Sequence, residues 1–186
     1  MNLRRLRGRL LSYAAAWIKP ESALIVPVPA AEQAVARSLG RARGGTAGLP
    51  LHVTLMYPFL RRSAIGRREE SALAELARSM EPFDFGLARL DRFPGVHYLA
   101  PESPAPFLAL TKAIQRSWPS CAPYRGAYDQ VIPHVTVFFG PEPPAGLDQL
   151  AQLLPIHAQA SEVCLIEQSR GRWRVRRRFP LGAVPQ

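Results

Sequence analysis

The chain has 186 residues, of which 47% are hydrophobic, 9% aromatic and 20% charged, a composition that excludes intrinsic disorder as the main state and fits one globular domain or two small ones fused tightly. Two cysteines, Cys121 and Cys164, are too few for a disulfide framework, and no run of about 18 apolar residues could span a bilayer, so we expect a cytoplasmic protein without a membrane partner. The net charge of +10 is concentrated at two places, with five basic residues in residues 1–20 and six in residues 170–178. The rest of the chain is nearly neutral, with 13 basic and 14 acidic residues. This distribution is compatible with polyanion binding but does not require it.

Residues 1–21 are expected to form a basic N-terminal extension. Its arginines precede the apolar run at residues 10–18, as in a secretion signal, but Lys19-Pro20 stands where a cleavage site of small residues belongs. An amphipathic helix, packed on the domain or on a partner, is the favoured interpretation. Its apolar positions recur at helical spacing: Leu3, Leu6, Leu10, Tyr13 and Trp17.

The first half of the remaining chain shows strand and helix patterns in alternation. Apolar or β-branched runs bounded by proline or glycine predict strands at residues 23–29, 51–57, 83–90 and 96–100. Helices are predicted at residues 31–39 and around Leu73, Leu76 and Met80.

The second half repeats this order. A helix is predicted around Phe107, Leu110 and Ile114, and a proline-rich connector at residues 119–133 leads to a strand at 135–139. A further helix around Leu147, Leu150 and Leu154 precedes a hairpin of residues 162–168 and 172–179. The sequence strand, helix, connector, strand therefore occurs twice.

The last predicted strand alternates basic and apolar residues. Alternation places its arginines on one face and its apolar residues on the other. The arginines fit either a solvated sheet edge that resists aggregation or a track for an RNA backbone. The two sets are Arg172, Arg174, Arg176 and Arg178, and Trp173, Val175 and Phe179.

Two matching motifs carry the strongest functional signal. They read Leu51-His52-Val53-Thr54-Leu55 and Pro133-His134-Val135-Thr136-Val137, each in a predicted strand of its own half. Four histidines and four threonines would give about 0.09 His-x-Thr triplets by chance. Residues at i and i+2 share one face of a strand, so each motif presents an imidazole beside a hydroxyl.

Two such pairs, meeting around one small group, would suit a phosphate. Threonine hydroxyls can donate to phosphoryl oxygens, and histidine can give or take protons near neutral pH. Phosphodiester hydrolysis needs one group to accept a proton from water and another to protonate the leaving oxygen, which two histidines can share. A zinc site would need three or four ligands, and only Asp129 and Glu142 lie near the motifs in sequence.

With these motifs the chain resembles the 2H phosphoesterases, and among them the 2′-5′ RNA ligases and RNA 2′,3′-cyclic phosphodiesterases, a family defined by two H-x-[ST]-x motifs. The resemblance covers roughly residues 22–182. Besides the two motifs, three segments are similar to the corresponding segments of the family: HVTLMYPF around the first motif, the turn Arg92-Phe93-Pro94-Gly95, and the closing hairpin. The resemblance implies an α+β fold of two pseudosymmetric lobes, approximately 22–93 and 94–182, with terminal elements open to exchange between them. Two antiparallel-rich sheets would line a central cleft, with helices outside.

The resemblance also implies an activity and a set of site residues. One of His52 and His134 would activate water and the other would protonate the departing 3′ oxygen, while Thr54 and Thr136 would hold the phosphoryl oxygens, with no metal or other cofactor. The family's arginine just before the second motif is replaced here by the segment 130–133, so Arg125, Arg61, Arg62 or a hairpin arginine would have to meet the phosphate charge.

Strand periodicity adds Met56 and Phe138 to the predicted cleft side, where Phe138 could stack on a base. Core packing explains an aromatic residue there equally well.

Three functions are left in competition by the sequence. The leading hypothesis is a metal-independent phosphodiesterase, a monomer, acting on a 2′,3′-cyclic or 2′-5′ bond of an RNA terminus or a small nucleotide. The second is an RNA-binding protein with little or no turnover that uses the same groove and its arginine-rich ends. The third is a metal-binding protein that uses His52 and His134.

Overall fold

The computed structural model describes residues 22–40 and 48–182, and the predicted N-terminal helix and most of the connector at 41–48 lie outside them. The described elements, in chain order, are β1 (Ser22–Pro27), α2 (Pro29–Leu39), β2 (His52–Met56), η2 (Arg62–Ala64), α3 (Arg67–Arg78), β3 (Phe83–Phe93), β4 (Val96–Pro101), α4 (Ala105–Ser117), η3 (Pro123–Gly126), β5 (Val135–Phe139), α5 (Leu147–Gln152), β6 (Ile156–Ala160), β7 (Glu162–Ser169) and β8 (Arg172–Pro180).

The α+β class and the repeated order strand, helix, strand are confirmed. The repeats are β1-α2-β2 and β4-α4-β5, and in both the two strands are antiparallel neighbours. The sequence missed one strand, β6, because its residues Ile156–Ala160 alternate too weakly to predict a strand, and it missed the short helices η2 and η3.

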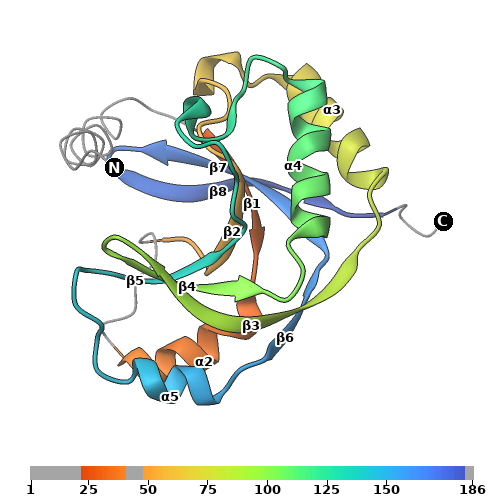
Figure 1. Cartoon of the computed structure of the whole chain (residues 1–186). Helices are drawn as coiled ribbons and strands as arrows, with labels where there is room; N and C mark the ends of the chain where they lie inside the picture. The colour runs from red at the N-terminus through yellow and green to blue at the C-terminus, as the bar shows by residue number, and fades with distance from the viewer. Residues whose placement is uncertain (1–21, 41–47, 183–186) are drawn as a thin grey trace.

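The strands form one eight-stranded sheet in the order β6-β3-β4-β5-β2-β1-β7-β8, curled as Figure 1 shows. Its two halves meet where β2 and β5 pair at Val53 and Val135. The remaining strands cross between the two halves of the sheet. β3 follows the first repeat in the chain but pairs with β4 of the second repeat and with β6. β7 follows the second repeat but pairs with β1 of the first repeat and with β8.

The main core lies between the sheet and the four described α-helices. Buried residues from β1, β2, β4 and β5 pack there with residues from α2, α3, α4 and α5 in one continuous cluster. We call this side of the sheet the helix face. A smaller apolar cluster lies on the other side, formed by Ala23, Ile25, Cys164, Ile166 and Trp173.

Within the described part of the chain, no helix is both long and apolar enough to cross a membrane.

Candidate active site

The two His-x-Thr motifs lie on neighbouring strands at the centre of the sheet. β-Branched residues favour extended backbone in both, and Val53 and Val135 are fully buried in the main core. Alternation therefore turns His52, Thr54, His134 and Thr136 to the opposite side, which we call the histidine face, where each is partly exposed.

The register of β2 and β5 brings the two motifs together. The strands are antiparallel and Val53 pairs with Val135, so His52 lies opposite Thr136, and Thr54 lies opposite His134. Directly opposite side chains start about 5 Å apart and diagonal ones about 7–8 Å apart. The four predicted residues thus occupy neighbouring positions on one face of the sheet.

Both imidazoles are held in the same way. Nδ1 of His52 lies 2.7 Å from the carbonyl oxygen of Pro50, and Nδ1 of His134 lies 2.6 Å from that of Ile132. A carbonyl oxygen only accepts, so Nδ1 is the donor in both rings and Nε2 is left for chemistry. In each motif the acceptor is the residue two positions before the histidine.

The surroundings of the two histidines favour their neutral forms. Burial lowers the pKa of His52 below 6.5, and the charge of His134 lowers it further, while the Pro50 carbonyl and the Glu32 carboxylate oppose the shift. Burial also lowers the pKa of His134, against the effect of the Ile132 carbonyl. Glu32 lies close because its Oε1 accepts the Leu51 backbone N–H at 2.6 Å.

Two aromatic residues that sequence reasoning missed enclose His134. The rings of Phe93 and Tyr98 stack with centroids 4.3 Å apart, and their centroids lie 5.2 and 5.0 Å from the imidazole. Tyr98 pairs with Thr136 across β4 and β5. Burial raises the pKa of Tyr98, and a hydrogen bond to Asp91 adds to this shift. The turn at Phe93 was readable in the sequence, but the pairing of β4 with β5 was not.

The predicted placement of Met56 and Phe138 on the histidine face is wrong. Met56 is fully buried in the main core, and Phe138 packs against that core and pairs with His97. The reason is a β-bulge in each motif strand. Leu24 pairs with Met56 and Ile25 with Thr54, which leaves Leu55 as an extra residue, and in the same way Val137 is extra between Thr136 and Phe138.

The predicted arginines lie at the end of β2 away from His52. Arg61 is exposed in the loop after β2, and Arg62 begins η2. Arg125 is exposed in η3, which is joined to this end of β2 by the Tyr124 N–H donating to the Tyr57 carbonyl at 2.5 Å. Tyr124 and Arg125 have φ of 51° and 57°, a left-handed conformation that non-glycine residues seldom adopt.

Metal ligands are sparse around the site. Nowhere in residues 22–40 and 48–182 do three histidine, cysteine, aspartate or glutamate side chains come together in an arrangement that could hold a metal ion.

Comparisons with known proteins bear on the family and on the fold. The family model described as the 2′-5′ RNA ligase superfamily matches residues 26–172. E. coli LigT complexed with NADP+ superposes with a TM-score of 0.59 at 20% identity over 89% of this chain and 99% of LigT. TT0787 of Thermus thermophilus superposes with a TM-score of 0.59 at 18% identity, over 88% of this chain and 100% of that one. These likenesses show the fold, and no curated protein sequence gives a significant match.

Proposed function

This chain belongs to the 2′-5′ RNA ligase superfamily, and from that membership we propose that it hydrolyses a 2′,3′-cyclic phosphate or a 2′-5′ phosphodiester of an RNA terminus or nucleotide, without a metal, by general acid and base catalysis. Membership supports a phosphodiesterase of the 2H type. Among structural neighbours, LigT has been crystallised with 3′-AMP, with ATP and with NADP+, and by analogy we propose that the histidine face takes a nucleotide.

One observation supports this proposal above the others: the two histidines are equivalent. Each donates Nδ1–H to the carbonyl two residues earlier, and each lies across the strand pair from the threonine of the other motif. A phosphate bound between them would meet an Nε2 on two sides, which suits a displacement in which the entering and leaving oxygens lie on opposite sides of phosphorus.

In the proposed reaction one imidazole removes a proton from water as the water oxygen bonds to phosphorus. The bond between phosphorus and the 3′ oxygen breaks, and the other imidazole, protonated at Nε2, gives its proton to that oxygen. The product is a 2′-phosphomonoester with a free 3′-hydroxyl. Thr54 and Thr136 donate hydrogen bonds to the non-bridging oxygens, where negative charge develops. Arg61 and Arg125 remain the proposed partners for the other charges of the substrate.

We assign the proton-donating role to His52 and the water-activating role to His134. The Glu32 carboxylate favours the charged form of His52. Burial lowers and a backbone carbonyl raises the pKa of both histidines, so the Glu32 carboxylate, acting against the charge of His134, is the feature that favours a proton on His52. A neutral His134 is ready to accept a proton, as a base must be.

The test is hydrolysis of 2′,3′-cyclic AMP in the presence of EDTA, with the product identified by phosphorus NMR. We expect a 2′-phosphate, and a fall in kcat of about 10²–10⁴ in His52→Ala and in His134→Ala. His157→Ala is the matched control, since it removes an exposed imidazole from β6. Hydrolysis by the double His52→Ala, His134→Ala variant would rule the mechanism out, and tight nucleotide binding without any turnover would favour the RNA-binding alternative.

A further inference from the structure

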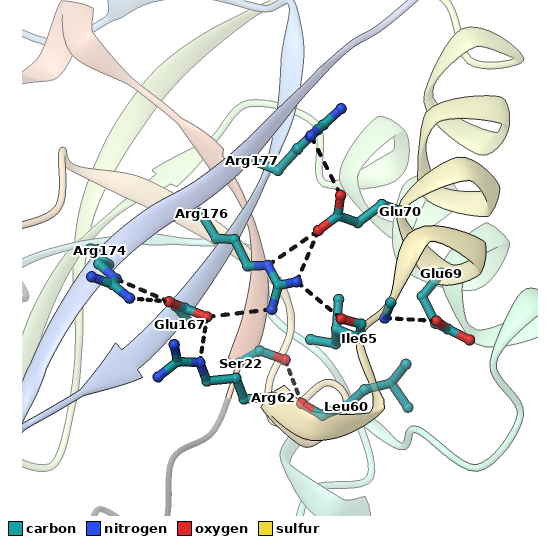
Figure 2. Close-up of polar contacts among 11 residues, drawn as sticks. Ser22, Leu60, Arg62, Ile65, Glu69, Glu70, Glu167, Arg174, Arg176 and Arg177 are labelled. Carbon is teal, nitrogen blue, oxygen red and sulfur yellow. Dashed lines mark hydrogen bonds and ion pairs between the residues drawn. The ribbon is translucent and has the colours of Figure 1, made fainter.

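A buried carboxylate holds three arginines where β7 and β8 meet η2. The Glu167 side chain is only 4% exposed. Its Oε1 accepts from Nε and Nη2 of Arg174 at 3.0 and 2.6 Å, and its Oε2 lies 3.3 Å from Nε of Arg62 and 3.5 Å from Nη1 of Arg176 (Figure 2).

A second carboxylate extends this arrangement onto α3. Oε1 of Glu70 lies 3.0 Å from Nη2 of Arg176, and Oε2 lies 3.5 Å from Nη1 of Arg177, while Arg176 also donates to the Ile65 carbonyl at 3.0 Å. We call Arg62, Arg174, Arg176 and Arg177 the arginine cluster. Its four positive charges face two carboxylates, so a formal charge of +2 is left over.

The carboxylates lie beneath the guanidinium groups and not among them at the surface. Arg62, Arg174 and Arg177 are 47, 59 and 61% exposed, whereas the two glutamates are 4 and 19% exposed. A guanidinium has five N–H donors, and Arg174 uses two of them on Glu167. The glutamates therefore fix the orientation of groups whose other donors remain available to an anion.

The cluster lies on the helix face of the edge strand β8, and Arg178, which forms an ion pair with Glu162, lies on the histidine face of the same strand. β8 is the last strand of the sheet, and Arg176 is an extra residue in its pairing with β7. After this bulge Arg178 pairs with Cys164, and its Nη1 lies 3.7 Å from the Cys164 sulfur, in the small apolar cluster of the histidine face. Arg177, by contrast, contacts Glu70 of α3 on the helix face. Guanidinium groups thus occupy both faces of one edge.

We propose that the arginine cluster is a docking surface for the phosphate backbone of single-stranded RNA. This proposal rests on the proposed function. It extends the ligand from a nucleotide to a polymer whose reactive end lies on the histidine face. Oriented guanidiniums bind phosphate bidentately, which suits a chain of phosphates. A membrane surface is disfavoured because the large exposed apolar residues of the described chain lie elsewhere: Tyr128, Ile132, Phe139 and Leu153.

The sharpest test uses the double variant Arg62→Gln, Arg177→Gln. It removes two exposed charges, while Arg174 and Arg176 remain on Glu167 and Arg176 remains on Glu70, so each carboxylate keeps a partner. The control is Arg37→Gln, Arg89→Gln, which removes the same charge from exposed positions of α2 and of β3, near the opposite edge of the sheet. Fluorescence anisotropy measures the binding of a labelled 12-nucleotide RNA with a 3′-hydroxyl end and of a dinucleotide.

In the cluster variant, we expect the ratio of 12-mer to dinucleotide affinity to fall about tenfold. The slope of log K against log salt for the 12-mer should also weaken by about 1.4. Neither quantity should change in the control variant. Equal losses in the two variants would overturn the proposal, as would binding of phosphatidylserine vesicles, but not of RNA, through these arginines. Because the RNA has no cyclic phosphate, its binding is independent of turnover. Failure to hydrolyse 2′,3′-cyclic AMP would therefore overturn the proposed function alone.

Discussion

Val53 of β2 pairs with Val135 of β5, and each is the residue between the histidine and the threonine of its motif. This pair therefore lies at the centre of the candidate site, and both valines are fully buried on the helix face. Because the strands are antiparallel, a single pairing fixes two histidines and two threonines at once. A shift of the register by one residue would separate them and turn one set into the core.

The two histidines should titrate below the ordinary range and should influence each other. NMR titration of the imidazole protons should give both a pKa below 6.5, because burial disfavours the charged ring. The variant His134→Gln should raise the pKa of His52, because a neighbouring positive charge is removed. A His52 pKa that is unchanged in this variant would show that the rings do not interact.

The same shifts set the pH dependence of the proposed reaction. A base with a lowered pKa is neutral over a wider range, and an acid with a lowered pKa keeps its proton only at lower pH, so both limbs of the profile move toward acid. The bell-shaped profile of kcat/KM should accordingly be centred below pH 6.5.

Removing either threonine hydroxyl should slow the chemical step. Thr54→Val and Thr136→Val keep the side-chain shape but lose the donor to the phosphoryl oxygens, so kcat should fall by about 10²–10³. Thr54→Ser and Thr136→Ser keep the hydroxyl and should retain most of the activity. Single-turnover rates separate these effects from binding, and a serine variant as slow as the valine variant would contradict the assigned role.

Tyr98 should act on His134 through its ring and not through its hydroxyl. Tyr98→Leu removes an aromatic neighbour 5.0 Å from the imidazole and admits water, so the pKa of His134 should rise toward 6.5 and kcat should fall about tenfold with little change in KM. Tyr98→Phe loses only the hydrogen bond to Asp91 and should behave nearly as the wild type. Equal effects of the two substitutions on the pKa of His134 would exclude this role.

Glu167 should contribute to stability as the anchor of the arginine cluster. Glu167→Leu removes the charge that orients Arg62, Arg174 and Arg176. We expect a loss of about 2 kcal/mol in the free energy of unfolding. The loss should be smaller than for a fully buried ion pair, because Arg62 and Arg174 are about half exposed. Urea unfolding measures it, with Glu75→Leu, at an exposed position of α3, as the control. A loss no larger than in the control would contradict the anchoring role.

Sequence reasoning predicted the four central residues because their pattern is local. A residue two positions from another on a strand shares its face, and this rule needs no knowledge of strand order. The duplication then implied that the two strands occupy equivalent places, and their pairing in the sheet agrees with that. The aromatic contacts of His134 depend on β4 lying next to β5, a long-range pairing that composition does not encode.

Three bulges limit the reach of the alternation rule. Leu55, Val137 and Arg176 are each an extra residue in an otherwise alternating strand. As a result, Met56 and Phe138 turn to the helix face, and Phe179 joins the main core on the side opposite Trp173, contrary to the prediction. Bulges of this kind have no compositional mark here, since neither glycine nor proline stands at any of the three positions.

The two Nδ1–H···O=C contacts have a consequence for the proton inventory of the protein. With Nδ1 donating to a carbonyl in both rings and both pKa values lowered by burial, the resting molecule favours Nε2 without a proton in both rings. An anionic ligand arriving between the rings would favour imidazolium, so its capture should draw a hydrogen ion from solution. Calorimetric titration with inorganic phosphate in buffers of different ionisation enthalpy would reveal that uptake as a heat that varies with the buffer.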